Sequence, residues 1–111
     1  MPGGKPFWAN LYQHGKGVPQ NDTDAVAWYR KAAEQGHAEG QQRLGWMYAN
    51  GRGVLQDTVK AHMWESLAVL NGETKAGALL GELAKRMTPA QLSHAQAMVQ
   101  TCRASNYKSC E

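Results

Sequence analysis

The stretch that decides the fold is Leu44-Gly45-Trp46-Met47-Tyr48-Ala49-Asn50-Gly51-Arg52-Gly53-Val54, in the middle of a chain of 111 residues. A shift of 36 residues aligns it, without a gap, with an earlier stretch of the same chain. The matching pairs include Tyr12 with Tyr48, Gly15 with Gly51, Gly17 with Gly53 and Val18 with Val54. The same shift carries Leu44-Gly45 onto Leu80-Gly81, so a third copy begins there. A fixed internal period of this length predicts a stack of repeated helical units.

The residues that recur suit closely packed helix pairs. Glycines supply the positive φ values that a tight reversal and a helix end require, and alanines at helical spacing let neighbouring helices approach each other. We expect the recurring tryptophans to lie on the same face as the alanines and to fill the space between pairs. The recurring positions are Ala25 and Ala61, Trp28 and Trp64, Ala32 and Ala68, and Gly36 and Gly72.

The pattern predicts six helices, whose ends are marked by capping residues. Asn21 or Asp22, and later Asp57, can cap the helices that follow them, and Thr88-Pro89-Ala90-Gln91 is a capping box. The helices are expected to run from about Pro6 to His14, Asp22 to Gln35, Ala38 to Asn50, Asp57 to Asn71, Glu73 to Arg86 and Thr88 to Ala104.

Two of these segments resemble a known repeat. The run from Leu44 to Val54 resembles the core of the Sel-one-like repeat, and the run from Ala25 to Gly36 is similar to its second helix. The resemblance covers roughly residues 7–86, and the helix from Thr88 to Ala104 looks like the closing helix that follows the last repeat in bacterial members. It implies a right-handed superhelix of antiparallel helix pairs, related to the tetratricopeptide repeats.

The expected fold class is therefore all-α: a right-handed α-α solenoid of about two and a half repeats with a C-terminal capping helix. We expect one domain over residues 1–111. Its parts are a shortened first repeat (7–36), a second repeat (37–72), the first helix of a third repeat (73–86), and a capping helix with a cysteine-containing tail (87–111). A shortened end exposes an apolar face, so a homodimer through the first helix is one expectation.

Composition and motifs argue against several classes of function. The net charge is +3, but Lys and Arg are scattered rather than gathered in a patch, so we expect no nucleic-acid partner. No apolar run could cross a bilayer, and no membrane insertion is expected. The histidines form no zinc signature, and His62 with Glu65 is interpreted as a surface helix pair. We therefore expect no catalytic residue, no cofactor and no metal.

The two cysteines, Cys102 and Cys110, stand at the end of the last helix and in the tail. Asn106, between them, can adopt the left-handed turn that would fold the tail back onto its helix. Spacing alone leaves two reduced thiols and a disulfide equally open, and the resemblance to secreted, cysteine-rich members implies the disulfide. A bridge would favour a periplasmic or secreted location.

Partner-binding residues are expected at positions that the repeat leaves variable. Trp46 corresponds to Asn10 and Glu82 under the shift, so the repeat does not require an aromatic residue there. Trp and Arg are enriched at interface hot spots. We expect Trp46, Arg43 and Asn50 to contribute to a binding face, flanked by Asn10 and Tyr12. The alternative is that Trp46 packs against a neighbouring helix.

The resemblance implies a protein-interaction module, since family members generally serve as adaptors or scaffolds. We expect a peptide or protein partner on the concave face and no catalysis. Two alternatives remain: a secreted hydrolase acting on cell-wall or β-lactam substrates, as suggested for some relatives, and an oligomerising end-piece of a larger solenoid.

Overall fold

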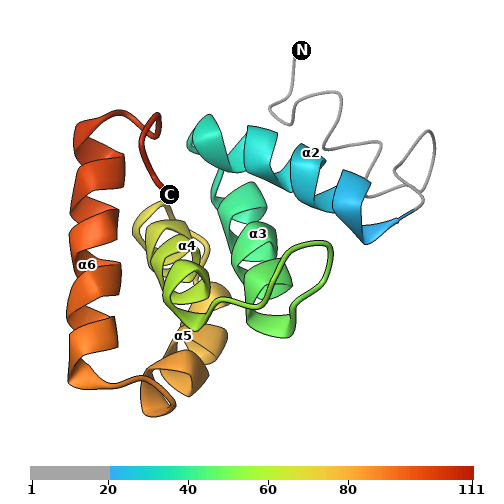
Figure 1. The fold of residues 1–111 in the computed structure, drawn as a ribbon. Helices are drawn as coiled ribbons and strands as arrows, with labels where there is room; N and C mark the ends of the chain where they lie inside the picture. The colour runs from blue at the N-terminus through green and yellow to red at the C-terminus, as the bar shows by residue number, and fades with distance from the viewer. Residues whose placement is uncertain (1–20) are drawn as a thin grey trace.

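The computed structural model describes residues 21–111, which form five α-helices and, within that range, no strand (Figure 1). This confirms the all-α helical repeat fold. The helix predicted from Pro6 to His14 lies outside the described residues. The observed helices are α2 (Asp22–Glu34), α3 (Ala38–Asn50), α4 (Thr58–Leu70), α5 (Ala76–Lys85) and α6 (Pro89–Ala104).

Capping side chains begin three of the helices where the sequence predicted them. Asn21, rather than Asp22, caps α2, with its Oδ1 accepting from the Asp24 amide at 2.8 Å. The Asp57 Oδ1 accepts from the Lys60 amide at 3.0 Å at the start of α4. Thr88 and Gln91 form both bonds of the capping box on α6, at 3.1 and 2.9 Å. Caps of this kind stabilise a helix by about 1 kcal/mol each.

The reversal after α3 depends on its two glycines. Gly51 ends α3 at φ 65° and Gly53 has φ 75°, a region that L side chains rarely adopt. A Cβ on Gly53 would lie only 2.3 Å from the carbonyl oxygen of Asp22. The glycine pair therefore makes the turn and also lets the loop lie directly against the start of α2.

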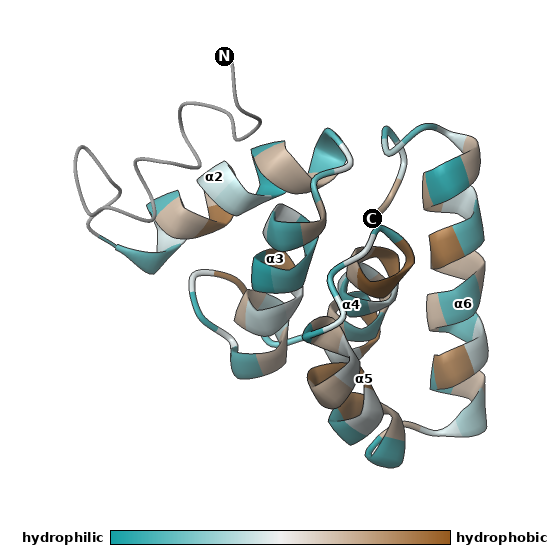
Figure 2. Cartoon of the chain, turned by 180° about the vertical axis from the view of Figure 1, so that it is seen from behind, coloured by the Kyte–Doolittle hydropathy of each residue, from teal (hydrophilic) through white to brown (hydrophobic). Residues whose placement is uncertain are grey.

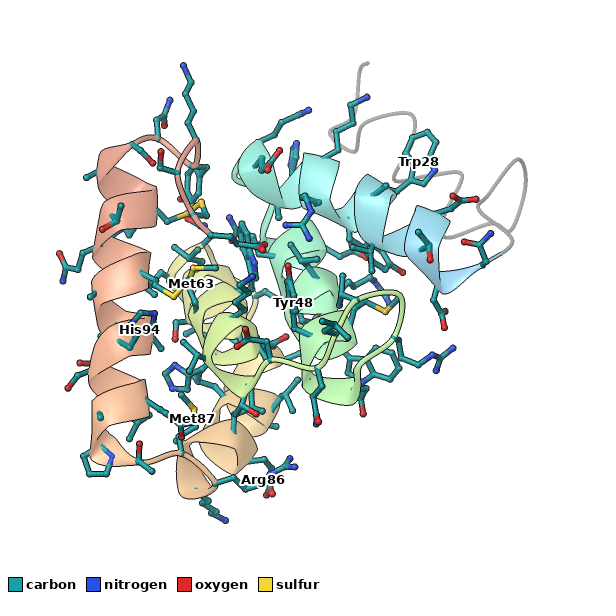
Figure 3. The ribbon with its side chains drawn as sticks, viewed as in Figure 1. Trp28, Tyr48, Met63, Arg86, Met87 and His94 are labelled. Carbon is teal, nitrogen blue, oxygen red and sulfur yellow. A yellow bond between two sulfur atoms is a disulfide. The ribbon has the colours of Figure 1, made fainter. Side chains whose placement is uncertain are left out.

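Helix α4 is the centre of the core, because it packs against α3, α5 and α6. Its Met63, Trp64 and Leu67 are at most 1% exposed. Figure 3 shows Met63 between α4 and α6, and Figure 2 shows the hydrophobic side of α6 turned toward α4. The predicted burial of Trp64 is confirmed. Trp28 is only half-buried and lies on the side of α2 away from α3 (Figure 3).

Helices α2 and α3 approach each other closely at Gly40. A Cβ on Gly40 would lie 2.3 Å from the Cβ of Ala32 and 3.0 Å from the backbone nitrogen of Ala33. Both alanines are buried, and Ala32 is one of the recurring small positions. The predicted role of small residues at this crossing is confirmed.

The start of the fifth helix differs from the prediction. It was expected at Glu73 but begins at Ala76. Gly72, at φ 104°, ends α4, and the amide of Glu73 donates back to the Ala68 carbonyl at 2.8 Å. The residues after it form a tight turn instead of the first turn of α5, because the Ala76 amide donates to the Glu73 carbonyl and the Gly77 amide to the Thr74 carbonyl, at 3.1 Å each.

The third copy of the repeat is not packed like the second. A Cβ on Gly45 would lie 2.3 Å from the Glu65 carboxylate, whereas a Cβ on Gly81, at the equivalent position of α5, would meet nothing within 4 Å. In the second copy, α3 packs tightly against α4. The following helix, α6, packs on α4 instead of closing over Gly81.

We predict that Gly40→Ala destabilises the protein by about 1–3 kcal/mol, because the methyl group would overlap buried atoms of α2 that have no room to move. Gly81→Ala is the matched control. It also adds a methyl group within a helix, but into open space, and should stabilise the protein by about 0.5–1 kcal/mol. Urea unfolding followed by circular dichroism measures both. Equal midpoints for Gly40→Ala and wild type would contradict the close approach of α2 and α3.

Candidate functional site

A groove with a volume of about 470 Å³ runs along α3, and we call it the α3 groove. Its size lies within the range of about 300–1,000 Å³ that is typical of ligand pockets. Four helices, α2 to α5, and the turn before α5 contribute to it. The lining residues are Asp22, Ala25 and Tyr29 of α2, Glu39, Gln42, Arg43, Trp46 and Met47 of α3, Glu65 of α4, and Glu73, Lys75 and Leu79 from the following segment.

The helical period brings Glu39, Gln42, Arg43 and Trp46 to one side of α3, because residues three, four and seven apart share a face. Leu44 and Tyr48 fall on other faces and are buried in the core. The same helix therefore supplies both packing residues and groove residues.

The structure brings two of the predicted partner-binding residues together in the groove. Trp46 is 45% exposed, and the Arg52 guanidinium lies 5.7 Å from its ring centroid. Arg43 lies over the Tyr29 ring at 6.0 Å and forms an ion pair with Glu39 at 3.6 Å.

The other predicted residues are placed differently. Asn50 is exposed at the end of α3 but does not line the groove, and its amide donates to the Trp46 carbonyl at 2.9 Å. Asn10 and Tyr12 lie outside the described residues.

The sequence analysis missed the most unusual group in the groove, the carboxyl of Glu65. Glu65 is fully buried, and neither of its carboxyl oxygens has a hydrogen-bond partner among the described residues. Burial, reinforced by the nearby charge of Glu73, raises the pKa of Glu65 to about 8. Tyr29 is its counterpart in the preceding repeat, so the 36-residue shift already contained the signal that Glu65 is atypical.

The interpretation of His62 and Glu65 as a surface pair is wrong. His62 is only 8% exposed, and burial lowers its pKa. Its Nδ1 lies 3.4 Å from the Ser66 hydroxyl. Both residues of the supposed pair are buried because α4 is covered by α3, α5 and α6.

The charges in the groove are mixed, with an acidic excess. Four carboxyl-bearing residues, Asp22, Glu39, Glu65 and Glu73, accompany Arg43 and Lys75. Asp22 is engaged by Arg52 at 2.6 Å. The groove therefore combines aromatic side chains with charges of both signs.

Two other kinds of feature are absent from residues 21–111. No group of three or more His, Cys, Asp or Glu side chains in this range could hold a metal ion. None of the helices in the same range is long and apolar enough to cross a membrane.

The disulfide implied by the resemblance is present between Cys102 and Cys110. Asn106 adopts the left-handed conformation expected of it, at φ 59°, and Tyr107 follows at φ 67°. The bridge and these two residues fold the tail back toward α4 and α3 (Figure 1).

Comparison with known proteins identifies related repeats. The model of the Sel1 repeat matches residues 7–37 and 38–73. The chain is 38% identical over 66 residues to chitin synthase regulator SKT5 of Malassezia restricta, covering 60% of this chain and 5% of that protein. It is 29% identical over 93 residues to alginate biosynthesis protein AlgK of Azotobacter vinelandii, covering 84% of this chain and 20% of that protein.

A solved structure shows the same architecture. It is c5321, a protective antigen present in uropathogenic Escherichia coli strains displaying an SLR fold. The match has a TM-score of 0.73 and 33% sequence identity, and covers 91% of this chain and 21% of that chain. The chain thus spans about a fifth or less of each of these proteins.

We predict that Glu65 makes the protein less stable as the pH rises from about 4.5 to about 8. Because the pKa of Glu65 is raised in the folded state, the folded protein holds this proton more tightly than the unfolded chain, so deprotonation favours unfolding. Glu65→Gln removes the titration. At pH 8 it should raise the Tm by at least about 4 °C, the shift expected of a gain near 1 kcal/mol in a small domain.

Thermal unfolding of both proteins between pH 5 and pH 9 measures this effect. The difference in Tm should be small at pH 5 and should grow with pH. A difference that is the same at every pH would show that Glu65 is already ionised in the folded protein.

Proposed function

Because the chain belongs to the Sel1 repeat family, we propose that it is a protein-interaction module that binds a peptide or protein segment in the α3 groove. Proteins built from Sel1 repeats are generally non-catalytic scaffolds. The concave face of stacked helix pairs offers an extended surface suited to such binding.

The observation that carries the proposal is the exposure of Trp46 in the lining of a groove. An indole that is 45% exposed gains free energy when a partner covers it. The repeat has Asn10 and Glu82 at the equivalent positions, so stacking of the helices does not require this side chain. Arg43 lies about one helical turn from Trp46 and also lines the groove. Trp and Arg are both enriched among the residues that dominate binding energy at interfaces.

The remaining residues of the proposed site have supporting roles. Asn50 fixes the end of α3 through its bond to the Trp46 carbonyl, and we propose that it borders the binding face. We propose that Asn10, the repeat counterpart of Trp46, flanks the same face, whereas the counterpart of Tyr12 is Tyr48, which does not line the groove.

The relatives support a part in a larger assembly. Their names describe a regulator of chitin synthase and a protein of alginate biosynthesis. We propose that this chain, like a repeat segment of such proteins, contributes recognition rather than chemistry. A disulfide within the tail fits an oxidising compartment, such as the periplasm or the extracellular space.

The other two functions are less well supported. A hydrolase needs a nucleophile with a base or paired carboxylates in a pocket. In the α3 groove, Asp22 and Glu39 are held by arginines, and the carboxyl of Glu65, which lies near that of Glu73, has no hydrogen-bond partner among the described residues. A homodimer through the first helix depends on residues outside the described range.

We predict that Trp46→Ala lowers affinity for a groove-binding peptide at least tenfold, while helicity and Tm stay nearly unchanged. A phage-displayed peptide library selected on the wild-type protein, with counter-selection on Trp46→Ala, supplies the peptides, and calorimetry measures their affinities. Leu70→Ala is the matched control, since Leu70 is 56% exposed but lies outside the groove.

Two results would contradict the proposal. One is a library in which no peptide distinguishes wild type from Trp46→Ala. The other is a collapse of the Tm in Trp46→Ala, which would show that the indole serves the core.

A further inference from the structure

Three helices direct polar groups at one carboxylate, the side chain of Glu111. Arg30 of α2 forms an ion pair with its Oε2, and the hydroxyl of Tyr48 on α3 donates to its Oε1. From α4, the indole N–H of Trp64 donates to Oε2 at 2.9 Å, and the Lys60 Nζ lies 3.5 Å from Oε1. We call Arg30, Tyr48, Lys60 and Trp64 the carboxylate pocket.

The pocket is strongly cationic around an aromatic centre. The Arg30 guanidinium and the Lys60 ammonium lie 5.8 and 5.5 Å from the centroid of the same Tyr48 ring. Arg30 also donates to the Tyr48 hydroxyl at 2.8 Å. Two cations beside one partly buried ring favour the binding of an anion there.

The bound carboxylate is held in its charged form. The Glu111 side chain is only 17% exposed, and burial alone would raise its pKa. Hydrogen bonds from Tyr48 and Trp64 and the charge of Arg30 outweigh burial and hold the pKa of Glu111 below its ordinary value. Hydrogen bonds from ionised donors such as Arg and Lys are among the strongest contacts that a protein makes to a carboxylate.

The pocket is separate from the α3 groove. None of its four residues lines that groove. Tyr48 and Trp46 are two positions apart on α3, which places their side chains on different faces of the helix. An inference about the carboxylate pocket therefore does not depend on what the groove binds.

The pocket is built from repeat residues, but its occupant comes from outside the repeats. All four pocket residues lie within the segments that match the repeat model, whereas Glu111 follows α6. Tyr48 and Trp64 recur with the repeat as Tyr12 and Trp28. Arg30 and Lys60 do not, since the shift pairs them with Ser66 and Asp24. The aromatic pair thus recurs with the repeat, and the two cations do not.

The occupant can leave while the tail stays in place. Glu111 directly follows Cys110, which the disulfide ties to α6. The tail is also held by Tyr107, whose hydroxyl lies 3.1 Å from the Asn71 amide nitrogen. Rotation of the Glu111 side chain alone would open the pocket, at the point where Figure 1 shows the C-terminus beside α4.

We propose that the carboxylate pocket is a second binding site, which takes an acidic group of a protein partner, and that Glu111 occupies it in the partner's absence. The acidic group is a carboxylate, supplied by an Asp or Glu side chain or by a chain end. A carboxylate of the partner can replace that of Glu111 and keep the same ion pairs and hydrogen bonds. A partner must therefore bind the pocket more favourably than Glu111 does.

The test uses the oxidised chain of 111 residues and pentapeptides that resemble its tail, with Gln in place of Lys so that the control is uncharged. One peptide, acetyl-Tyr-Gln-Ser-Ser-Glu-amide, carries only a side-chain carboxylate. A second, acetyl-Tyr-Gln-Ser-Ser-Gln with an unblocked end, carries only a chain-end carboxylate, and its amide is the neutral control. Affinities are measured by calorimetry, and the NMR signal of the Trp64 indole N–H reports occupancy of the pocket.

In Glu111→Ala, which empties the pocket, at least one acidic peptide should bind at least tenfold more tightly than the neutral peptide. The same peptide should bind the wild type at least tenfold more weakly, because Glu111 competes. Adding Arg30→Met to Glu111→Ala should abolish the preference for acid, while circular dichroism shows the helices intact. The relative affinities of the two acidic peptides distinguish a side chain from a chain end.

Several outcomes would overturn the proposal. One is equal binding of acidic and neutral peptides to Glu111→Ala. Another is a lowered urea midpoint in Glu111→Ala with no acidic peptide bound, which would make Glu111 a structural latch only. If Glu111→Ala does not fold, Glu111→Gln keeps the shape and removes the charge. Failure of that variant to bind acid in preference to amide would also overturn the proposal.

Discussion

The close packing of α3 against both neighbouring helices is the constraint on which the rest of the structure depends. It is possible because Gly40 and Gly45 have no side chains where α3 meets Ala32 on one side and Glu65 on the other. Once α3 is held in this way, each of its faces has a definite environment. Leu44 enters the core, Trp46 enters the α3 groove, and Tyr48 reaches the carboxylate pocket.

The second helix of the central repeat shows how a stacking element can also carry unusual groups. Trp64 is buried by its neighbours and still uses its indole N–H to hold Glu111. Glu65, the next residue, is buried beside Gly45 with no partner for its carboxyl among residues 21–111. A buried carboxyl of this kind costs stability when it ionises.

Much of the fold could be predicted because its signals are local and periodic. The helix starts are marked by capping side chains that act over a few residues, at Asn21, Asp57 and Thr88. The helix ends are marked by glycines, at Gly51 and Gly72. The predicted start of α5 was wrong because a tight turn, in which the Ala76 amide donates to the Glu73 carbonyl, precedes the helix, whereas α3 begins directly after the equivalent residue, His37. His62 and Glu65 were placed on the surface because a helix wheel cannot show which sides of α4 its neighbours cover.

Some residues of the candidate sites could be found from the repeat, and others are brought together only by packing. The 36-residue shift singled out Trp46 as a position that stacking does not require, and the same comparison of Glu65 with Tyr29 would have singled out Glu65. The sequence by itself therefore determined the repeat, the helices and the variable positions, because each follows from spacing along the chain. Only the tertiary structure decided the carboxylate pocket. Arg30, Tyr48, Lys60, Trp64 and Glu111 are far apart in the chain, and the packing of three helices and the return of the bridged tail bring them together.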